Sequence, residues 1–240
     1  MSAKKPGGAT RTLIVNADDF AASEGVNRGI VHAHVHGIVT SASLMVTGHA
    51  TEHAARLAGE HPGLGVGLHW DLDEESLSHP VELEDPHAVR RELVRQLEAF
   101  ERLMGRPPTH LDSHHHVHRF DEVAPVAREL ATALGIPLRD EGSVRYVGGF
   151  YGQWEWQVTD LEHIEPEFLI WMLRNEVGDG WTEIACHPGF VTGDFTSVYL
   201  AEREVEVETL TDPRVRAEVE ALGIRLASYA DLERREDPGA

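Results

Sequence analysis

The sequence predicts a distorted (β/α) barrel of about seven parallel strands. Short β-branched or apolar runs alternate along the chain with longer segments of helical periodicity, the rhythm of repeated β-α units around a parallel sheet. Capping residues punctuate the helical segments at the expected places. With 240 residues, 41% hydrophobic and 26% charged, the chain can bury one large core. We therefore expect one domain over residues 11–235, after a disordered N-terminal segment 1–10.

The expected elements follow one another in regular order. The strands are 13–15, 43–46, 66–68, 109–112, 136–139, 183–186 and 225–227. The helices are 26–35, 52–58, 89–104, 123–134, 168–177 and 229–235. Ser23 caps the first helix, Pro166 and Pro213 suit first turns, and Gly37, Gly135 and Gly223 suit left-handed caps. About seven such units favour closure into a barrel.

Composition excludes several classes of partner and site. The 21 basic and 41 acidic residues give a formal charge of −20, which repels nucleic acid and anionic membrane surfaces. No run approaches the roughly 18 to 20 apolar residues of a membrane span, and no apolar signal core follows Lys5, so we expect a cytoplasmic protein. The lone Cys186 forms neither a disulfide framework nor a thiolate metal site. Any metal must rest on histidines and carboxylates, and a homodimer is left open.

Ionisable residues directly follow four of the expected strands. The carboxyl ends of the strands in a parallel barrel meet at one end, where active sites gather. We therefore expect these side chains to lie together. They are Asp18 and Asp19 after the first strand, His69 after the third, Asp112 and His114 after the fourth, and His187 after the sixth.

The adjacent carboxylates Asp18 and Asp19 favour a cation site. Two like charges at the end of an apolar strand are costly to desolvate unless a cation or hydrogen bonds compensate. The alternative is a solvated turn ahead of the Ser23 cap.

The histidine-rich run 110–118 is the strongest single signal. A strand period of two places His110, Asp112 and His114 on one face. One carboxylate with two imidazoles is an open coordination set for a divalent metal, whose bound water is a nucleophile near neutral pH. The alternative is a histidine-rich surface loop.

Four motifs in this order resemble the YdjC-like (ChbG/HpnK) carbohydrate deacetylases, over about Leu13 to Leu232. The motifs are Asn16-Ala17-Asp18-Asp19-Phe20, Gly37-Ile38-Val39-Thr40-Ser41, the run His110 to His118, and His187-Pro188-Gly189. The resemblance implies a distorted (β/α) barrel related to polysaccharide deacetylases. It further implies a metal held by Asp19, His69 and His114, with Asp18 as the catalytic base.

The chain departs from the family pattern at two places. Ala21 stands where the family usually has Gly, and Trp70-Asp71-Leu72-Asp73 replaces an Asn-Leu-Thr type stretch. The acidic loop 71–86 contains no Lys or Arg, which argues against a phosphorylated substrate.

We expect the protein to hydrolyse the acetamide of an N-acetylated amino sugar or oligosaccharide, releasing acetate. A metal polarises the carbonyl and binds water, Asp18 takes the water's proton, and His187 protonates the departing amine. The imidazole of His187 could instead cap the turn that follows it. Asp112 is expected to orient a ligand histidine, and Arg139 to steady Asp18.

Two details stay open at this point. His118 is the reserve ligand, since related polysaccharide deacetylases use histidines four apart, and His116 and His118 are the alternative acids. The metal is Mg²⁺ by resemblance, whereas a histidine-rich set favours Zn²⁺ or another transition metal.

Two other functions compete with deacetylation. His110-Leu111-Asp112 fits half of a 2-His-1-carboxylate iron oxygenase site, but those enzymes are typically all-β jelly rolls. A catalytically silent sugar-binding or metal-storage protein is the other alternative. Asp18 beside Asp19 speaks for catalysis, because binding a metal does not require the second carboxylate.

Overall fold

A computed structural model describes residues 10–72, 81–155, 157–194 and 196–233 of the chain. Seven parallel strands form one curled sheet in the order β4-β3-β2-β1-β6-β5, with β7 also paired to β1. They are β1 (Arg11–Phe20), β2 (Ser41–Leu44), β3 (Gly65–Trp70), β4 (Leu111–Ser113), β5 (Val144–Val147), β6 (Gly180–Cys186) and β7 (Arg225–Leu226). A bridge between Leu111 and Leu138 extends the β4 edge toward the segment that leads into β5. The predicted parallel barrel-like fold is confirmed.

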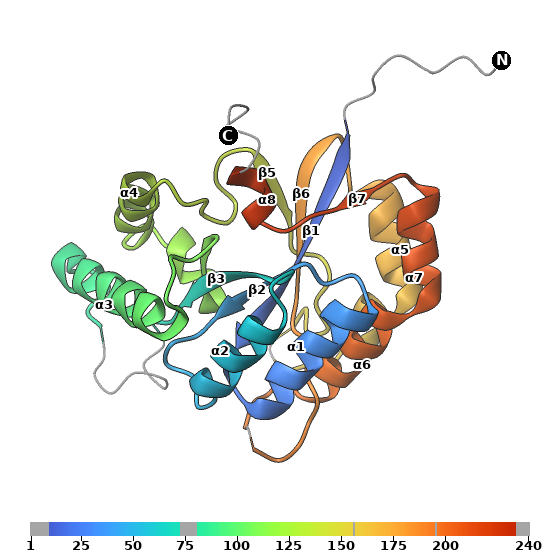
Figure 1. Cartoon of the computed structure of the whole chain (residues 1–240), viewed down its shortest axis with the longest axis horizontal. Coiled ribbons are helices and arrows are strands. Elements are labelled where there is room, and N and C mark those ends of the chain that lie inside the picture. Colours follow the sequence, from blue (N-terminus) through green and yellow to red (C-terminus); the bar gives the residue numbers. More distant parts are fainter. Residues whose placement is uncertain (1–9, 73–80, 156, 195, 234–240) are drawn as a thin grey trace.

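Most of the helices lie around the outside of this sheet, whereas the short last helix packs its Leu232 against side chains on the inner face (Figure 1). The helices are α1 (Glu24–His36), α2 (Thr51–Glu60), α3 (Pro86–Met104), α4 (Ala124–Leu134), α5 (Pro166–Asn175), α6 (Ala201–Thr211), α7 (Pro213–Ala221) and α8 (Ala230–Glu233), with 3-10 turns η1 (His114–Arg119) and η2 (Leu161–Ile164). Neighbouring helices contact one another in the order α4, α3, α2, α1 and α6, with α5 and α7 beside α6. The helix order thus follows the strand order.

Strand β1 shows how the sheet separates core from site. Leu13 and Val15 belong to the main hydrophobic core, whereas Ile14 packs in a second cluster with Val144 and Tyr229. Side chains alternate between the two faces of a strand, so Asn16 and Asp18 share the face of Ile14. This face is the interior of the curled sheet, and the polar residues stand at its carboxyl end.

Most expected helix ends are confirmed. Ser23 Oγ accepts a hydrogen bond of 3.1 Å from Val26 N. Pro166 and Pro213 begin α5 and α7, and Gly135 and Gly223 both have φ of 64°. The left-handed cap expected at Gly37 is wrong, because its φ is −124°. A Cβ there would lie 2.2 Å from the carbonyl oxygen of Leu210, so this glycine permits close packing of α1 on α6.

Three elements differ from the sequence prediction. The expected strand 136–139 makes only the bridge at Leu138, because the chain turns away through Asp140 and Gly142, both with positive φ, and the strand is β5 instead. Helix α6 was not predicted, and α7 was marked only by its ends, through Pro213 and Gly223. The inner face of α6 buries the charged Glu202, Arg203 and Glu206, so α6 lacks an apolar stripe.

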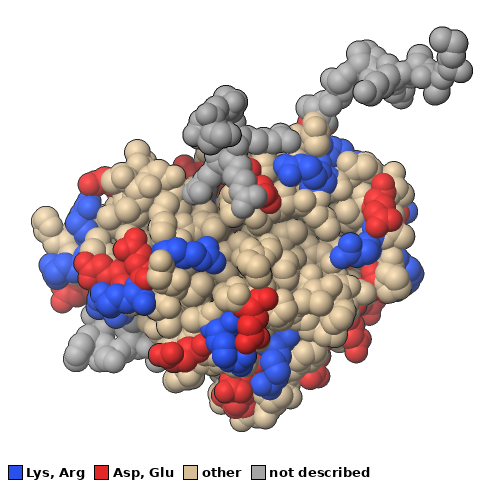
Figure 2. Space-filling view, in the orientation of Figure 1, with Lys and Arg blue, Asp and Glu red and all other residues tan. Residues whose placement is uncertain are grey.

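The described residues show neither a one-sign charged face in the view of Figure 2 nor a membrane-spanning helix. In the view of Figure 2, acidic and basic side chains are interspersed rather than gathered by sign. None of the helices within the four described ranges combines the length and apolarity of a membrane span. The N-terminal segment 1–10 expected to be disordered lies outside the described residues, except for Thr10.

Candidate active site

The Asp18-Asp19 pair lies buried at the end of β1. The two residues are 2% and 3% exposed. Asp19 and Ala21 both have positive φ, 64° and 85°, so the chain turns sharply after the carboxylates. Ala21 N donates a 2.7 Å hydrogen bond to Asn27 Oδ1, which holds the turn. The position of Ala21 is one that favours glycine, which gives a physical reason for the glycine usual in the family.

Asp18 is held by a buried arginine. Arg139 Nη1 and Nη2 each donate a 2.7 Å hydrogen bond to one oxygen of the Asp18 carboxylate, and Asn16 Nδ2 donates another of 2.8 Å. Burial alone would raise the pKa of Asp18, but Arg139 holds that pKa well below its ordinary value. The carboxylate is therefore ionised and fixed in orientation, as expected from the sequence.

Asp19 divides its two oxygens between different partners. Oδ2 accepts a 2.6 Å hydrogen bond from Arg203 Nη2. Oδ1 is buried without a hydrogen bond of normal geometry, and it faces His114 Nδ1 at 3.2 Å and His69 Nε2 at 3.5 Å. Burial opposes the charge of Asp19, yet Arg203 and the two histidines hold its pKa well below the ordinary value.

His69 and Asp112 complete this end of the sheet. His69 Nδ1 lies 2.8 Å from Asp112 Oδ1. Because a carboxylate only accepts, Nδ1 carries the hydrogen of this contact, and Nε2 is the nitrogen that can bind a cation once it has lost its own proton. Although burial works against it, the carboxylate field raises the pKa of His69 to about 10. This location attracts positive charge, and one ligand atom each from Asp19, His69 and His114 lies within 4.8 Å of the others.

The histidine run does not stay extended, contrary to the sequence prediction. Extended backbone ends at Ser113, and η1 begins with His114, with positive φ at His115 and His116. His114 still reaches Asp19. The turn directs the later histidines elsewhere: His118 Nδ1 pairs with Ser113 Oγ, and His116 Nε2 lies 3.2 Å from Tyr146 Oη.

His110 packs away from the Asp19 group. Its ring stacks on Tyr229 at 4.1 Å between centroids, in space left free by Gly67, whose added Cβ would lie 2.4 Å from the imidazole. Among the described residues, no group of side chains that could hold a metal includes His110, so the iron-oxygenase pattern His110-Leu111-Asp112 does not form a metal site. The parallel α/β sheet also differs from a jelly roll.

His187 follows β6 and lies beside Asp18. Its Nε2 is 3.9 Å from Asp18 Oδ2, and its Nδ1 is 4.0 Å from Glu206 Oε1 and forms no hydrogen bond within the described residues. Burial lowers the pKa of His187 to about 4, so the imidazole is neutral at pH 7. The rings of Tyr151 and Tyr199 pack against it, each 5.4 Å away between centroids.

Sequence reasoning missed the contribution of α6. Arg203 binds Asp19, and Glu206 accepts hydrogen bonds from His187 N and Tyr199 Oη. Burial raises the pKa of Glu206 to about 8. Glu183 in β6 was also missed, and it accepts from Arg139 at 2.9 Å. No local sequence pattern marks these residues. A charged helix face such as that of α6 usually indicates a surface exposed to solvent.

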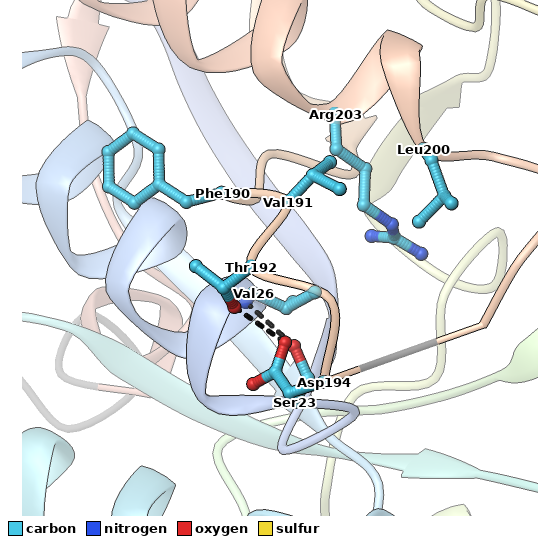
Figure 3. A pocket seen from close by; sticks show the side chains of 8 residues that line it. All are labelled: Ser23, Val26, Phe190, Val191, Thr192, Asp194, Leu200 and Arg203. Carbon is cyan, nitrogen blue, oxygen red and sulfur yellow. Dashed lines mark hydrogen bonds between the residues drawn. The ribbon is translucent and has the colours of Figure 1, made fainter.

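A small pocket adjoins the site behind Arg203 (Figure 3). It lies between the first turn of α1, the segment after β6 and the start of α6. Its lining residues are Ser23, Val26, Phe190, Val191, Thr192, Asp194, Leu200 and Arg203. Arg203 therefore connects this lining to Asp19.

The chain is similar in sequence to one family of known proteins. The family model of YdjC-like proteins matches residues 12–221. The chain belongs to the YdjC-like family. A chitooligosaccharide deacetylase of Serratia marcescens is 34% identical over 92% of the chain and 99% of the relative. A carbohydrate deacetylase of Geobacillus stearothermophilus is 38% identical over 92% of the chain and 98% of the relative.

Solved structures place this YdjC-like chain among similar folds. An Enterococcus faecalis protein with a proposed role in cellobiose-phosphate cleavage has a TM-score of 0.80 at 28% identity, covering 93% of this chain and 99% of its own. The peptidoglycan deacetylase PdaC of Bacillus subtilis has a TM-score of 0.55 at 13% identity, covering 95% and 94%. The second likeness shows a shared fold alone.

Proposed function

We propose that this YdjC-like protein is a metal-dependent carbohydrate deacetylase that hydrolyses the acetamide of an N-acetylated amino sugar. One observation carries the proposal: the buried Asp19 Oδ1, without a hydrogen bond, faces two imidazole nitrogens while a second ionised carboxylate, Asp18, stands next to it. A silent metal-binding protein would need the first group but not Asp18. The names of the two curated relatives support the same reaction class.

Asp19, His69 and His114 would hold the metal. An unpartnered carboxylate oxygen and two nearby imidazoles fit a divalent cation, and the 2.8 Å contact of His69 with Asp112 fits the carboxylate–histidine pairs that orient metal ligands. When bound, the metal polarises the acetamide carbonyl and lowers the pKa of water. His118 is not among the three residues whose ligand atoms converge, and its Nδ1 pairs with Ser113 Oγ.

Asp18 would act as the base. Arg139 orients its carboxylate and keeps it ionised, so it can accept a proton from water as that water adds to the acetamide carbon. A carboxylate with a depressed pKa is a weak base, and the proton that it accepts passes on readily.

His187 would deliver a proton to the amine. The neutral imidazole must first gain a proton, and Asp18 Oδ2 at 3.9 Å is the nearest group that has taken one from water. As the carbon–nitrogen bond breaks, the imidazole gives a proton to the amine nitrogen, and acetate and the free amino sugar remain. His116 and His118 are placed farther along η1, against Tyr146 and Ser113.

The ligand set favours Zn²⁺ or another transition metal over Mg²⁺, since two of three ligands are imidazoles and Mg²⁺ prefers oxygen. The substrate argument from the acidic loop 71–86 concerns residues that lie partly outside the described ranges. A cytoplasmic location stays a prediction, as does a homodimer.

Acetate release tests the proposal. Metal-free protein would be supplied in turn with Mg²⁺, Zn²⁺, Mn²⁺ and Co²⁺ and incubated with N-acetylated mono- and oligosaccharides. We expect acetate with at least one metal, no oxygen consumption, and release slower by about two or more orders of magnitude from metal-loaded Asp18→Asn. Folded, metal-loaded protein that binds these sugars but releases no acetate from any of them would instead be a silent binding protein.

A further inference from the structure

An aromatic strip lies on the surface and runs from the segment after β5 to α5. Its four side chains are Trp154, His163, Phe168 and Trp171. Consecutive ring centroids lie 4.7, 4.9 and 5.6 Å apart. Trp154 is 60% exposed and Trp171 is 49% exposed. Neither tryptophan packs in the hydrophobic core, so the fold does not account for their presence, and contiguous exposed aromatic surface usually marks a binding site.

The chain segment that leads into the strip starts at Tyr151, which contacts His187. Tyr151 packs against His187 and stacks on Tyr199 at 4.8 Å. Trp154 is only three residues farther along, so its Cα lies within about 11 Å of that of Tyr151. From Trp154 the strip continues through η2 to α5.

The segment that carries Trp154 is fixed. Gly152 N donates to Tyr199 Oη at 2.9 Å, and Gln153 Nε2 donates to Val198 O at 2.8 Å and to Glu202 Oε1 at 2.7 Å. These hydrogen bonds hold the segment to the start of α6, the helix that also carries Arg203 and Glu206. Trp154 therefore has a set position relative to the catalytic end of the sheet.

The chemistry of the strip suits a sugar chain. One face of a pyranose ring presents C–H groups, which pack against the negative face of an aromatic ring and bury apolar surface. The exposed acidic residues Glu155, Glu162 and Glu165 are neighbours of the rings in the sequence, and Glu167 is paired with Arg214. Their charge repels anionic chains and accepts neutral sugars or sugars that carry a free amine.

We propose that the strip of Trp154, His163, Phe168 and Trp171 binds the neighbouring sugar units of an N-acetylated oligosaccharide while one acetamide lies at Asp18 and His187. This inference rests on the proposed deacetylase function and extends it to substrates longer than one sugar. A second copy of the chain is the competing occupant of the same surface.

Chain-length dependence of the reaction tests the strip. Acetate release from an N-acetylated disaccharide and pentasaccharide would be compared for the wild type, Trp154→Ala, Trp171→Ala and the double variant. We expect the double variant to raise the KM for the pentasaccharide about tenfold, with kcat unchanged and the disaccharide unaffected. Val35→Ala, on α1 and 49% exposed, is the matched control and should change neither.

A binding measurement separates this inference from the proposed function. Calorimetric titration with the pentasaccharide needs no turnover, and we expect the double variant in the Asp18→Asn background to bind about tenfold more weakly than Asp18→Asn alone. Equal affinities and equal KM values would reject the role of the strip in sugar binding, even if acetate is released. Loss of a dimer in sedimentation with unchanged KM would assign the surface to a second copy. Absence of acetate from every substrate, with the expected binding difference, would reject only the deacetylase function.

Discussion

Arg139 and Asp18 form a bidentate ion pair, with two hydrogen bonds of 2.7 Å, both residues almost fully buried. The same guanidinium contacts Asp112 at 2.7 Å and Glu183 at 2.8 Å. A buried arginine is stable only when such partners satisfy its donors. Arg139 therefore joins strands β1, β4 and β6 at the end of the sheet where the site lies.

The first prediction concerns Asp18→Asn. The amide keeps the shape of the carboxylate, and Arg139 keeps Asp112 and Glu183 as partners, so we expect the fold and metal content to persist. Turnover should fall by about two or more orders of magnitude, the range for loss of a general base. Acetate release and metal analysis of the same sample check this. A rate near that of the wild type with full metal would remove Asp18 from the role of base.

The metal set gives the second prediction. Asp19→Ala, His69→Ala and His114→Ala should each lower metal occupancy, because each removes one of the three converging ligand atoms. His115→Ala is the control within the same turn, and we expect it to retain the metal. Elemental analysis of the purified variants decides. Equal loss in all four proteins would mean that the histidine run binds metal without a defined geometry.

The order of the chain predicted much of the site. Asp18, His69 and His187 each follow an apolar run, and parallel strands deliver such residues to one end of a sheet. The side-chain directions in the histidine run were harder to predict. A period of two assumes extended backbone, but the turn η1 begins at His114. Its placement depends on the turn, which the spacing alone does not encode.

The remainder of the site depends on tertiary contacts that leave no local pattern. Arg203 and Glu206 lie 184 and 19 residues from their partners Asp19 and His187, on a helix whose buried face is charged. Hydrophobic periodicity detects helices that bury apolar stripes, so α6 escapes it. The burial of such a charged helix face can be recognised only when the residues that pair with it are known to be buried.

The third prediction concerns acid stability and His110. This imidazole is fully buried, and burial lowers its pKa to about 4. Between the unfolded pKa near 6.5 and pH 4, the unfolded chain binds a proton that the folded chain does not, so stability falls as the pH drops through this window and then levels off. His110→Phe keeps a ring against Tyr229 and removes the titration.

Urea unfolding of the metal-free proteins at pH 7 and pH 4 measures this effect. We expect the wild type to lose on the order of 3 kcal/mol more free energy of unfolding than His110→Phe between the two values. The other titrating groups are common to both proteins and cancel in the comparison. Equal losses would mean that His110 is not the source of the acid sensitivity.

The last prediction concerns His187 and depends on the leaving group. An amine must be protonated as the carbon–nitrogen bond breaks, whereas a phenolate leaves without a proton. His187→Ala should therefore lower turnover of an N-acetylated sugar by about two or more orders of magnitude and spare a phenyl acetate ester, with unchanged metal content. The alternative is that the imidazole only caps the turn at Pro188-Gly189. The structure favours the first reading, because His187 Nδ1 makes no hydrogen bond in the described residues, while the backbone of His187 is held by Glu206 and Arg203 independently of the side chain. Equal losses on both substrates in folded, metal-loaded protein would reject the acid role and direct attention to His116 or His118.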